Sequence, residues 1–415
     1  MSGTATPVTS PTGKGSGRST ADVKLPYIDI ARPGFSTKSR EVMEARAESW
    51  CARTPFGLAV LRHRQAGQLL RDRRLRQGSH AWPDIIGISG RFAEFWKASL
   101  ISIEGVEHRN LRRIAQAALS EEFVLSLEPA FRGIAADLAD GLRDSDAFEF
   151  VHAFSEPFAG RAITALLALP DGDAHAIARD ASTLGLAMGL DAPNHESAVN
   201  AACSRLTDLA ADLIARARLG QDKVGYVARL VREADAAGFT DRQALIDLVV
   251  ISIFGGVDTT RAQLAFAAYL FAQHADQWHW LRQNPEMVPQ AIEEVIRRYP
   301  TTTWATREAL ETFEHDGVEI RKGATIHVFV HATATDPATG ADETFNIREP
   351  QKTHFGFGAG AHHCLGQFVA RTDMAAALLE LLGRWQGITL AGQPEFLPDS
   401  GNTSPARLGI RPIWA

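Results

Sequence analysis

The most informative stretch of this chain reads His354-Phe-Gly-Phe-Gly-Ala-Gly-Ala-His-His-Cys-Leu-Gly366. A helical pattern follows it, and the spacing of apolar residues predicts a helix over about 364–384. Cys364 therefore lies at the predicted start of a helix, where free N–H groups and the positive end of the helix dipole favour an anion. This position predicts a cysteine that is held as a thiolate.

The residues around this cysteine indicate what the thiolate binds. Glycines leave the backbone bare, so that a flat ligand can approach it closely; they are Gly358, Gly360 and Gly366. Phe355 and Phe357 supply an apolar wall. A shielded thiolate beside a bare backbone suits a soft metal centre, and haem iron in particular.

Cys364 has three other possible roles. A lone cysteine at a helix start is often structural, but that role leaves the glycines and aromatic residues unexplained. A small metal site would use His354, His362, His363 and Cys364. Adjacent His363 and Cys364 leave little room for tetrahedral ligation, which argues against that site. A hydrolase with Cys364 as nucleophile and His362 or His363 as base is the third interpretation.

Two motifs upstream carry further signals. Glu294 and Arg297 lie three residues apart in the predicted helix 291–299 and can pair on one face. The run Gly255-Gly-Val-Asp-Thr-Thr260 interrupts a long apolar helix, although each glycine costs about 1 kcal/mol relative to alanine there. Thr259 can donate a hydrogen bond to the carbonyl of Gly255 one turn earlier. The alternative without a functional role is that this run is a simple helix kink.

The pattern Phe357-x-x-Gly360-x-His362-x-Cys364-x-Gly366 resembles the haem-binding signature of the cytochrome P-450 family at every fixed position. The resemblance covers roughly residues 25–415. It implies haem b as the cofactor and Cys364 as the proximal ligand of the iron. It also implies that Phe357 packs beside this cysteine and that His362 binds a haem propionate, with Gly366 in the same haem-binding loop.

The resemblance extends to the upstream motifs. It implies that Gly255 and Gly256 lie on the distal side of the haem, where Asp258 and Thr259 would relay protons for oxygen activation. Further propionate ligands would be His108, Arg112 and Arg307. The pair Glu294 and Arg297 would be buried and would hold the loop leading to the cysteine.

Two departures from the family pattern stand out. Ala334-Thr-Asp-Pro337 replaces the family's Asn-Arg-Asp-Pro. In the family, a further arginine normally joins the pair that corresponds to Glu294 and Arg297. Here Arg348 comes one position earlier than that arginine, so the sequence leaves open whether it joins the pair.

Composition limits the function classes. The net charge of −6 speaks against nonspecific nucleic-acid binding. No uninterrupted apolar run reaches the roughly 18 residues of a membrane span, so no membrane partner is expected. Three scattered cysteines do not form a disulfide framework, which favours a reducing, cytoplasmic location. A basic cluster is either a solvated helix face or a docking patch for an acidic partner; it comprises Arg62, His63, Arg64, Arg71, Arg73, Arg74 and Arg76.

The predicted organisation is a disordered tail over 1–22, rich in Ser, Thr, Gly and Pro, followed by one haem domain over 23–415. The domain is mainly helical with a small β region, an α+β layout in the cytochrome P-450 fold. The main predicted helices are 38–52, 64–73, 127–143, 157–168, 197–218 and 241–274. Predicted strands are 56–61, 318–320 and 325–330, with a loop over 333–353 and short strands within 386–413.

The expected function is that of a haem-thiolate monooxygenase that uses dioxygen to oxidise a small organic molecule of natural-product metabolism. The substrate would lie above the haem against Ile253, Phe254, Val257 and residues of 175–200. Electrons would come from a separate ferredoxin and ferredoxin reductase, or from another reductase. The alternatives are a haem-binding sensor or a peroxide-dependent haem-thiolate enzyme.

Overall fold

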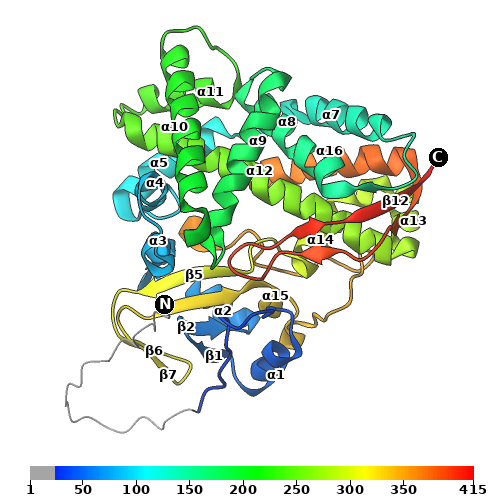
Figure 1. The fold of residues 1–415 in the computed structure, drawn as a ribbon. Coiled ribbons are helices and arrows are strands. Elements are labelled where there is room, and N and C mark those ends of the chain that lie inside the picture. The colour runs from blue at the N-terminus through cyan, green and yellow to red at the C-terminus, as the bar shows by residue number, and fades with distance from the viewer. Residues whose placement is uncertain (1–23) are drawn as a thin grey trace, which may run out of the picture.

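The computed structural model describes residues 24–415, so the predicted tail over 1–22 lies outside the described residues. A large helical body lies above a smaller β region that carries the N-terminal part of the described chain (Figure 1). This arrangement confirms the mainly helical α+β class predicted from the sequence.

The β region is built on a five-stranded sheet with the order β1-β2-β8-β5-β3. Strands β2 and β8 run parallel, and the other neighbouring pairs are antiparallel. The strands are β1 (Cys51–Thr54), β2 (Gly57–Val60), β3 (Leu75–Gln77), β5 (Trp304–Ala309) and β8 (Thr325–Phe329). Segments far apart in the sequence therefore meet in this sheet, and the chain following the Glu294 helix joins the N-terminal strands.

Three smaller sheets complete the β structure. Strand β12 (Gly409–Trp414) lies between β4 (Phe148–Glu149) and β9 (Trp385–Leu390). Two further antiparallel pairs join β6 (Phe313–His315) to β7 (Val318–Ile320), and β10 (Glu395–Phe396) to β11 (Pro405–Arg407). The strands predicted over 318–320, 325–330 and within 386–413 are thus confirmed.

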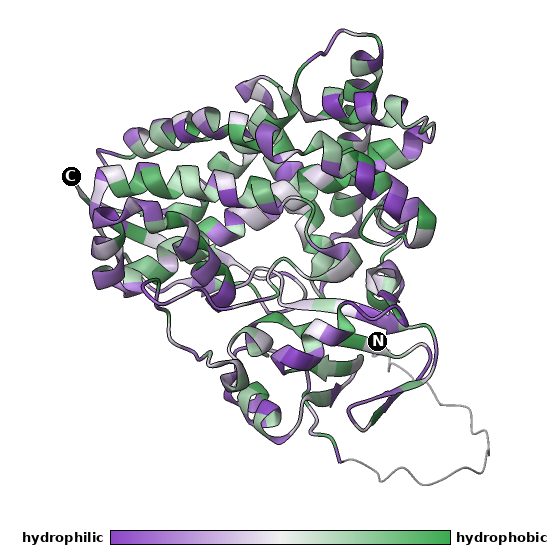
Figure 2. Ribbon diagram, turned by 180° about the vertical axis from the view of Figure 1, so that it is seen from behind, coloured by the Kyte–Doolittle hydropathy of each residue, from purple (hydrophilic) through white to green (hydrophobic). Residues whose placement is uncertain are grey.

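The helical body carries most of the remaining chain. Many of its helices show both hydrophilic and hydrophobic residues along their length, as amphipathic packing requires (Figure 2). The first eight helices are α1 (Arg40–Glu48), α2 (His63–Leu69), α3 (Trp82–Ile86), α4 (Arg91–Ala98), α5 (Gly105–Ala118), α6 (Glu121–Ser126), α7 (Glu128–Gly141) and α8 (Glu156–Leu167). The others are α9 (Ala174–Gly185), α10 (Glu196–Arg218), α11 (Gly225–Ala236), α12 (Arg242–Gln273), α13 (Ala275–Gln283), α14 (Val288–Arg298), α15 (Val330–Ala334) and α16 (Gln367–Arg384).

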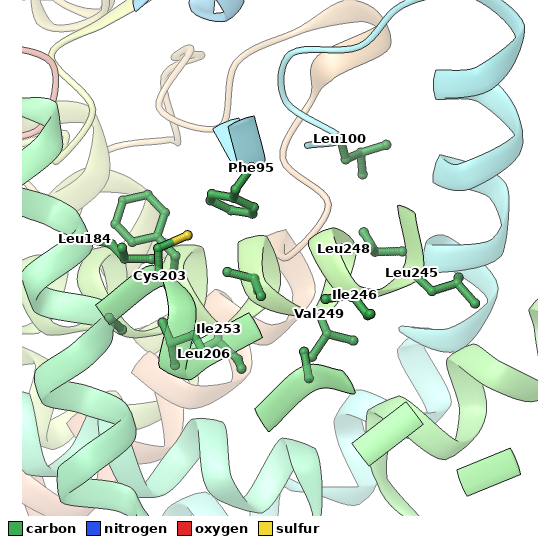
Figure 3. Packing of buried hydrophobic residues seen from close by; sticks show 14 of the residues in the cluster. Phe95, Leu100, Leu184, Cys203, Leu206, Leu245, Ile246, Leu248, Val249 and Ile253 are labelled. Carbon is green, nitrogen blue, oxygen red and sulfur yellow. The ribbon is translucent and has the colours of Figure 1, made fainter. Parts of the chain in front are cut away.

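Helix α12 is the central element of the body. Asp241 caps its first turn by accepting a hydrogen bond from the Ala244 N–H at 3.0 Å. By length and composition α12 resembles a membrane span, but 67% of its most apolar window is buried inside the fold. Side chains of α4, α9 and α10 cover its N-terminal half, and the Cys203 sulfur lies among them (Figure 3). Burial of this kind is typical of the core helix of a large domain.

Several sequence-predicted boundaries are corrected by the structure, among them the end of the helix predicted over 64–73, which lies at Leu69. The helix predicted over 38–52 ends at Glu48, because Cys51–Thr54 pairs with β2 in a hairpin. The hairpin needs glycine at position 57, where φ is +133° and a Cβ would lie 2.1 Å from the Thr325 carbonyl oxygen. Helix α16 begins at Gln367, three residues later than predicted. The loop predicted over 333–353 begins with the end of α15.

Candidate haem site

The cysteine loop over 354–366 folds back on itself before α16. The Cys364 N–H donates to the Phe357 carbonyl oxygen at 2.8 Å, which fixes the cysteine beneath the loop. Gly358 and Gly360 adopt φ of +67° and +76°. A Cβ at Gly360 would lie 2.5 Å from the Leu70 carbonyl oxygen, so this glycine permits close packing against the end of α2. A Cβ at Gly366 would meet nothing within 4 Å, which leaves its face open.

The protonation of Cys364 differs from the sequence prediction. Burial raises the pKa of the Cys364 thiol, while the Gly366 backbone and the positive charges of Arg112 and Arg371 lower it to a smaller extent. The stabilisation of the thiolate that is expected from a helix N-terminus is weak, because α16 begins only at Gln367. A buried thiol of this kind is deprotonated by the metal that it ligates, since a coordinating thiolate is stabilised by the metal charge.

One cavity of about 450 Å³ lies against this loop and collects most of the predicted site residues. They are Arg112, Gly255, Gly256, Thr259, Arg307, Phe357, His362, Cys364 and Gly366. Helices α5 and α12, strand β5 and the cysteine loop thus bring these residues together. His108 and Asp258 are the two predicted residues that do not line the cavity.

Two arginines present positive charge at the base of the cavity. Arg307 is 4% exposed and donates to the Gln77 side-chain oxygen at 3.0 Å and to the Ala359 carbonyl at 3.2 Å. Burial lowers the pKa of Arg307 to about 10, and the nearby Glu104 opposes that shift. Arg112 donates to the His363 carbonyl at 2.5 Å. Both guanidiniums are therefore anchored on backbone or amide oxygens beside the cysteine loop, where they suit a carboxylate ligand.

Two histidine rings lie close together in the same region, tilted by 33°. The rings of His108 and His362 have centroids 4.2 Å apart. His108 is buried, and its Nε2 has no hydrogen-bond partner among the residues that the structure describes. Burial lowers the pKa of His108 to about 4, reinforced by the charges of His362 and Arg112. An unpaired ring nitrogen next to two guanidiniums fits the carboxylates of a haem, whose oxygens would supply the missing acceptor.

Glu104, which was not predicted from the sequence, is part of the same cluster. Its carboxylate accepts from the Gln77 N–H at 2.6 Å and pairs with His362 Nε2 at 3.0 Å. Burial raises the pKa of Glu104, but the hydrogen bonds from His362 and Gln77 outweigh it and lower the value to about 2. The one sequence signal for this role is the position of Glu104 just before α5, four residues from His108.

The glycine-rich segment of α12 forms the opposite wall of the cavity. As predicted, the Thr259 hydroxyl donates to the Gly255 carbonyl oxygen one turn earlier. A Cβ at Gly255 would meet nothing within 4 Å, whereas one at Gly256 would lie 3.0 Å from the Ile163 side chain. Gly255 therefore keeps the cavity open, and Gly256 permits close packing of α8 on α12.

Asp258 does not line the cavity, in contrast to Thr259. Its carboxylate pairs with Arg261 at 2.8 Å and accepts from the Asn402 amide at 3.2 Å. Asn402 itself lines the cavity, on the loop that precedes β11. Asp258 is thus linked to the cavity through Asn402 rather than directly.

The predicted buried pair on α14 is confirmed. Glu294 accepts two hydrogen bonds from Arg297, at 2.6 and 2.8 Å, and the Arg297 side chain is 1% exposed. Arg297 also donates to backbone carbonyls of 334, 342 and 344, which ties α14 to the chain leading to the cysteine loop. Arg348 does not join this network. Arg348 pairs with Asp276 at the surface. The Asn346 N–H donates a hydrogen bond to the Glu294 carboxylate instead.

A second network on α14 was not predicted from the sequence. Glu293 accepts from Arg371 at 2.6 Å and pairs with His354 at 3.0 Å. The Arg371 guanidinium lies 4.4 Å above the Phe357 ring. Burial raises the pKa of Glu293, but its bonds to His354 and Arg371 lower the value to about 2. This carboxylate therefore joins α14, α16 and the cysteine loop.

The upper part of the cavity is apolar. Phe254 lines it as predicted, whereas Ile253 and Val257 are core residues of α12 that do not. Met188 and Leu190 supply the expected contribution from 175–200. Other lining residues are Trp82, Ile85, Trp96, Leu100, Ile163 and Leu166. Ile85 and Leu190 are 48% and 43% exposed, which indicates an apolar mouth toward solvent.

Together, a half-buried cysteine under a bare backbone, a carboxylate-binding cluster with an unpaired nitrogen, and a largely apolar cavity fit haem b. The cytochrome P-450 family model matches residues 194–400. The luteothin monooxygenase of Streptomyces thioluteus is 35% identical over 395 residues, which cover 93% of this chain and 96% of that protein. The chain belongs to the cytochrome P-450 family. It is a haem-thiolate monooxygenase with haem b as cofactor, and it uses a substrate, dioxygen and a separate source of electrons.

Other relatives extend this comparison. The mycinamicin IV hydroxylase/epoxidase of Micromonospora griseorubida is 29% identical, with 89% of this chain and 92% of that protein covered. Among solved structures, CalO2 superposes with a TM-score of 0.80 at 25% identity and covers 91% of this chain and 98% of its own. CxnD, an enzyme for C–S bond formation in chuangxinmycin biosynthesis, has a TM-score of 0.77 at 25% identity and covers 89% and 93%.

Proposed function

We propose that this monooxygenase oxidises a small, largely apolar natural product. The observation that carries the proposal is the apolar cavity that joins the Cys364 loop to the Gly255–Thr260 segment of α12. The names of the relatives support it, since they refer to luteothin, mycinamicin IV and nocardicin C.

The proposed haem site uses the predicted residues in these roles. Cys364 ligates the iron, and Phe357 and Gly366 shape the loop around it. The propionate groups bind to Arg112, Arg307, His362 and the unpaired Nε2 of His108. On the distal side, Gly255 leaves room in the cavity and Gly256 lets α8 pack closely on α12. When bound, the haem supplies the activation of dioxygen at its iron.

Thr259 and Asp258 are the proposed proton carriers. The Thr259 hydroxyl lies at the cavity wall and holds its proton toward the Gly255 carbonyl. Asp258 is 6% exposed and reaches the cavity only through Asn402. For Asp258 to deliver a proton, its carboxylate must exchange the contact with Arg261 or Asn402 for one with water in the cavity. Asn402 is therefore a positioning residue in this proposal.

The alternatives fit the structure less well. A peroxide-dependent enzyme or a haem sensor has no use for a hydroxyl backed by a carboxylate on the distal wall. A cysteine hydrolase needs a histidine hydrogen-bonded to the thiol, and no such bond occurs within residues 24–415. No cluster of three or more potential metal ligands is found in the same residues, which argues against the small metal site.

The electron donor is proposed to be a ferredoxin with its ferredoxin reductase, in the cytoplasm. Part of the predicted basic cluster is neutralised, since Arg64, Arg74 and Arg76 pair with Asp316, Asp72 and Glu308. Arg71 and Arg73 are exposed, and Arg71 lies near His363 of the cysteine loop. These two cations beside the proximal loop favour docking of an acidic protein. The three free cysteines agree with a reducing compartment.

Turnover tests this proposed function. The haem-loaded protein is supplied with a surrogate ferredoxin, its reductase and reduced nicotinamide, and is incubated with a panel of apolar natural products. The proposal predicts an oxygen-dependent product that carries one added oxygen atom or one new bond. Product formation with peroxide alone, and none with dioxygen and electrons, would favour the peroxide-dependent enzyme.

A further inference from the structure

The cavity continues beyond the haem site onto the opposite face of the five-stranded sheet. Successive side chains of a strand point to opposite faces. Arg307 of β5 therefore points toward the cysteine loop, where it contacts the Ala359 carbonyl, while Thr306 points to the other face. His327 of β8 lies directly opposite Thr306 in the register and shares that face. Residues of both faces line the same cavity.

We call the part of the cavity on this second face the sheet lobe. Its lining residues are Ile30, Phe56, Trp304, Thr306, Thr325 and His327. Trp304 packs edge-on against the His327 ring, with centroids 5.7 Å apart. Phe56 is 37% exposed, so the lobe reaches the surface near the turn between β1 and β2. A long molecule can thus extend from the haem site to this lobe within one cavity.

The His327 side chain is the unexplained polar group of the sheet lobe. It is 6% exposed, and its Nδ1 meets the Thr306 hydroxyl at 3.3 Å. Its Nε2 has no close hydrogen-bond partner within the described part of the chain, and the Phe56 backbone makes only a weaker polar contact with the ring. A buried polar atom without a partner costs about 1–3 kcal/mol, so such atoms in folded proteins normally meet water or a ligand.

The charges of the sheet lobe indicate which ligand group fits. Burial lowers the pKa of His327 to about 4, although the Phe56 carbonyl favours the protonated ring, so the imidazole is neutral at neutral pH. None of the six lining residues of the lobe is acidic or carries a fixed positive charge. A charged ligand group would be buried there without a counter-ion, which is costly. The lobe therefore fits a neutral group.

We propose that Nε2 of His327 binds a neutral oxygen substituent, a hydroxyl or carbonyl, at the far end of an elongated and otherwise apolar substrate whose reacting end lies in the haem site. His327 is then a specificity-determining residue that selects substrates by length and by a terminal polar group. This proposal rests on the proposed function, because it takes the reacting end to lie beside the haem.

Azole ligands of graded length test the proposal on the haem-loaded protein. One series is 1-alkylimidazoles, and the other is the matching ω-(imidazol-1-yl)alkan-1-ols. The imidazole end binds the iron and shifts the Soret band, so that titration gives a Kd without turnover. The proposal predicts that the alcohol binds at least as tightly as the alkane of equal length at one chain length, and less tightly at shorter lengths.

Variants of His327 supply the decisive comparison. In His327→Leu the Kd of that alcohol should rise about tenfold, whereas the Kd of the equal-length alkane stays within about twofold. His327→Gln keeps a hydrogen-bonding side chain and should restore part of the preference. Unchanged alkane binding shows that the cavity of each variant is intact. A variant that does not load haem is replaced by Thr306→Val, which frees Nδ1 and should shift alcohol binding alone.

The outcomes separate the two proposals. If no azole of either series shifts the Soret band, the haem site itself is wrong. If the azoles bind but the hydroxyl improves Kd at no chain length, or if His327→Leu weakens alkane and alcohol equally, the assignment of His327 is overturned. Its Nε2 is then satisfied by water alone.

Discussion

The carboxylate of Asp258 pairs with the guanidinium of Arg261, one turn further along α12, at 2.8 Å. Both side chains are largely buried, at 8% and 13% exposure. The carboxylate does not line the cavity and reaches it through Asn402. To deliver a proton, Asp258 must break a buried contact in each catalytic cycle. Its contribution to the rate of product formation can therefore be measured separately from that of Thr259.

Asp258→Asn should slow product formation about 100-fold or more, because the amide cannot supply a proton and general acid catalysis is worth that much. The measurement is the rate of product formation at saturating dioxygen and reductant. Asp180→Asn is the matched control, since Asp180 is a carboxylate of similar burial, 7% exposed, that pairs with Arg205 and does not line the cavity. A rate in Asp258→Asn equal to that of the control would contradict the role of Asp258.

Thr259→Ala should separate electron uptake from product formation. The hydroxyl at the cavity wall is lost, so reduced nicotinamide is consumed while the yield of product per electron pair falls. Coupling is measured as product formed per nicotinamide oxidised. Ser252→Ala is the control, because Ser252 makes the same kind of backbone bond to Leu248 on α12 and also lines the cavity. Equal coupling in the two variants would remove Thr259 from the proposed relay.

Arg297→Ala should lower the free energy of unfolding by about 3–5 kcal/mol, because it leaves the buried Glu294 carboxylate without its counter-ion. Chemical denaturation followed by circular dichroism gives this value. Arg348→Ala should cost no more than about 1 kcal/mol, since its pair with Asp276 is exposed. Equal losses in the two variants would show that Arg348 belongs to the buried network after all.

Arg73→Glu should slow reduction of the iron by a ferredoxin and weaken the salt dependence of that rate, because an exposed cation of the docking surface is reversed. Stopped-flow reduction at several ionic strengths measures both. Arg74→Glu serves as a comparison, since Arg74 is already paired with Asp72 and lies over the Phe313 ring. No change in rate or salt slope for Arg73→Glu would place the docking surface elsewhere.

The features that the sequence predicted well are local. The bond from Thr259 to Gly255 and the pair of Glu294 with Arg297 each join residues within one helical turn, so spacing alone predicts them. The cysteine loop was predicted because its glycines and aromatic residues are contiguous. The amphipathic helices followed from apolar periodicity in the same way.

The features that the sequence did not predict depend on distant contacts. Glu104 meets His362 across 258 positions, and Glu293 meets Arg371 across 78. The raised pKa of Cys364 is a consequence of burial, which no local pattern reports. The hairpin that ends α1 at Glu48 depends on pairing with β2. Such contacts are set by tertiary packing, which overrides local propensity.

Carbon monoxide binding to the reduced, haem-loaded protein tests the ligation of iron by Cys364 most directly. Ligation by Cys364 should give the strongly red-shifted Soret band that a thiolate ligand produces, and this band should be lost in Cys364→Ser. Cys203→Ala, which changes a cysteine buried in the helical core, should keep it. An unshifted, imidazole-type band in the native protein, or an unaltered band in Cys364→Ser, would contradict the account.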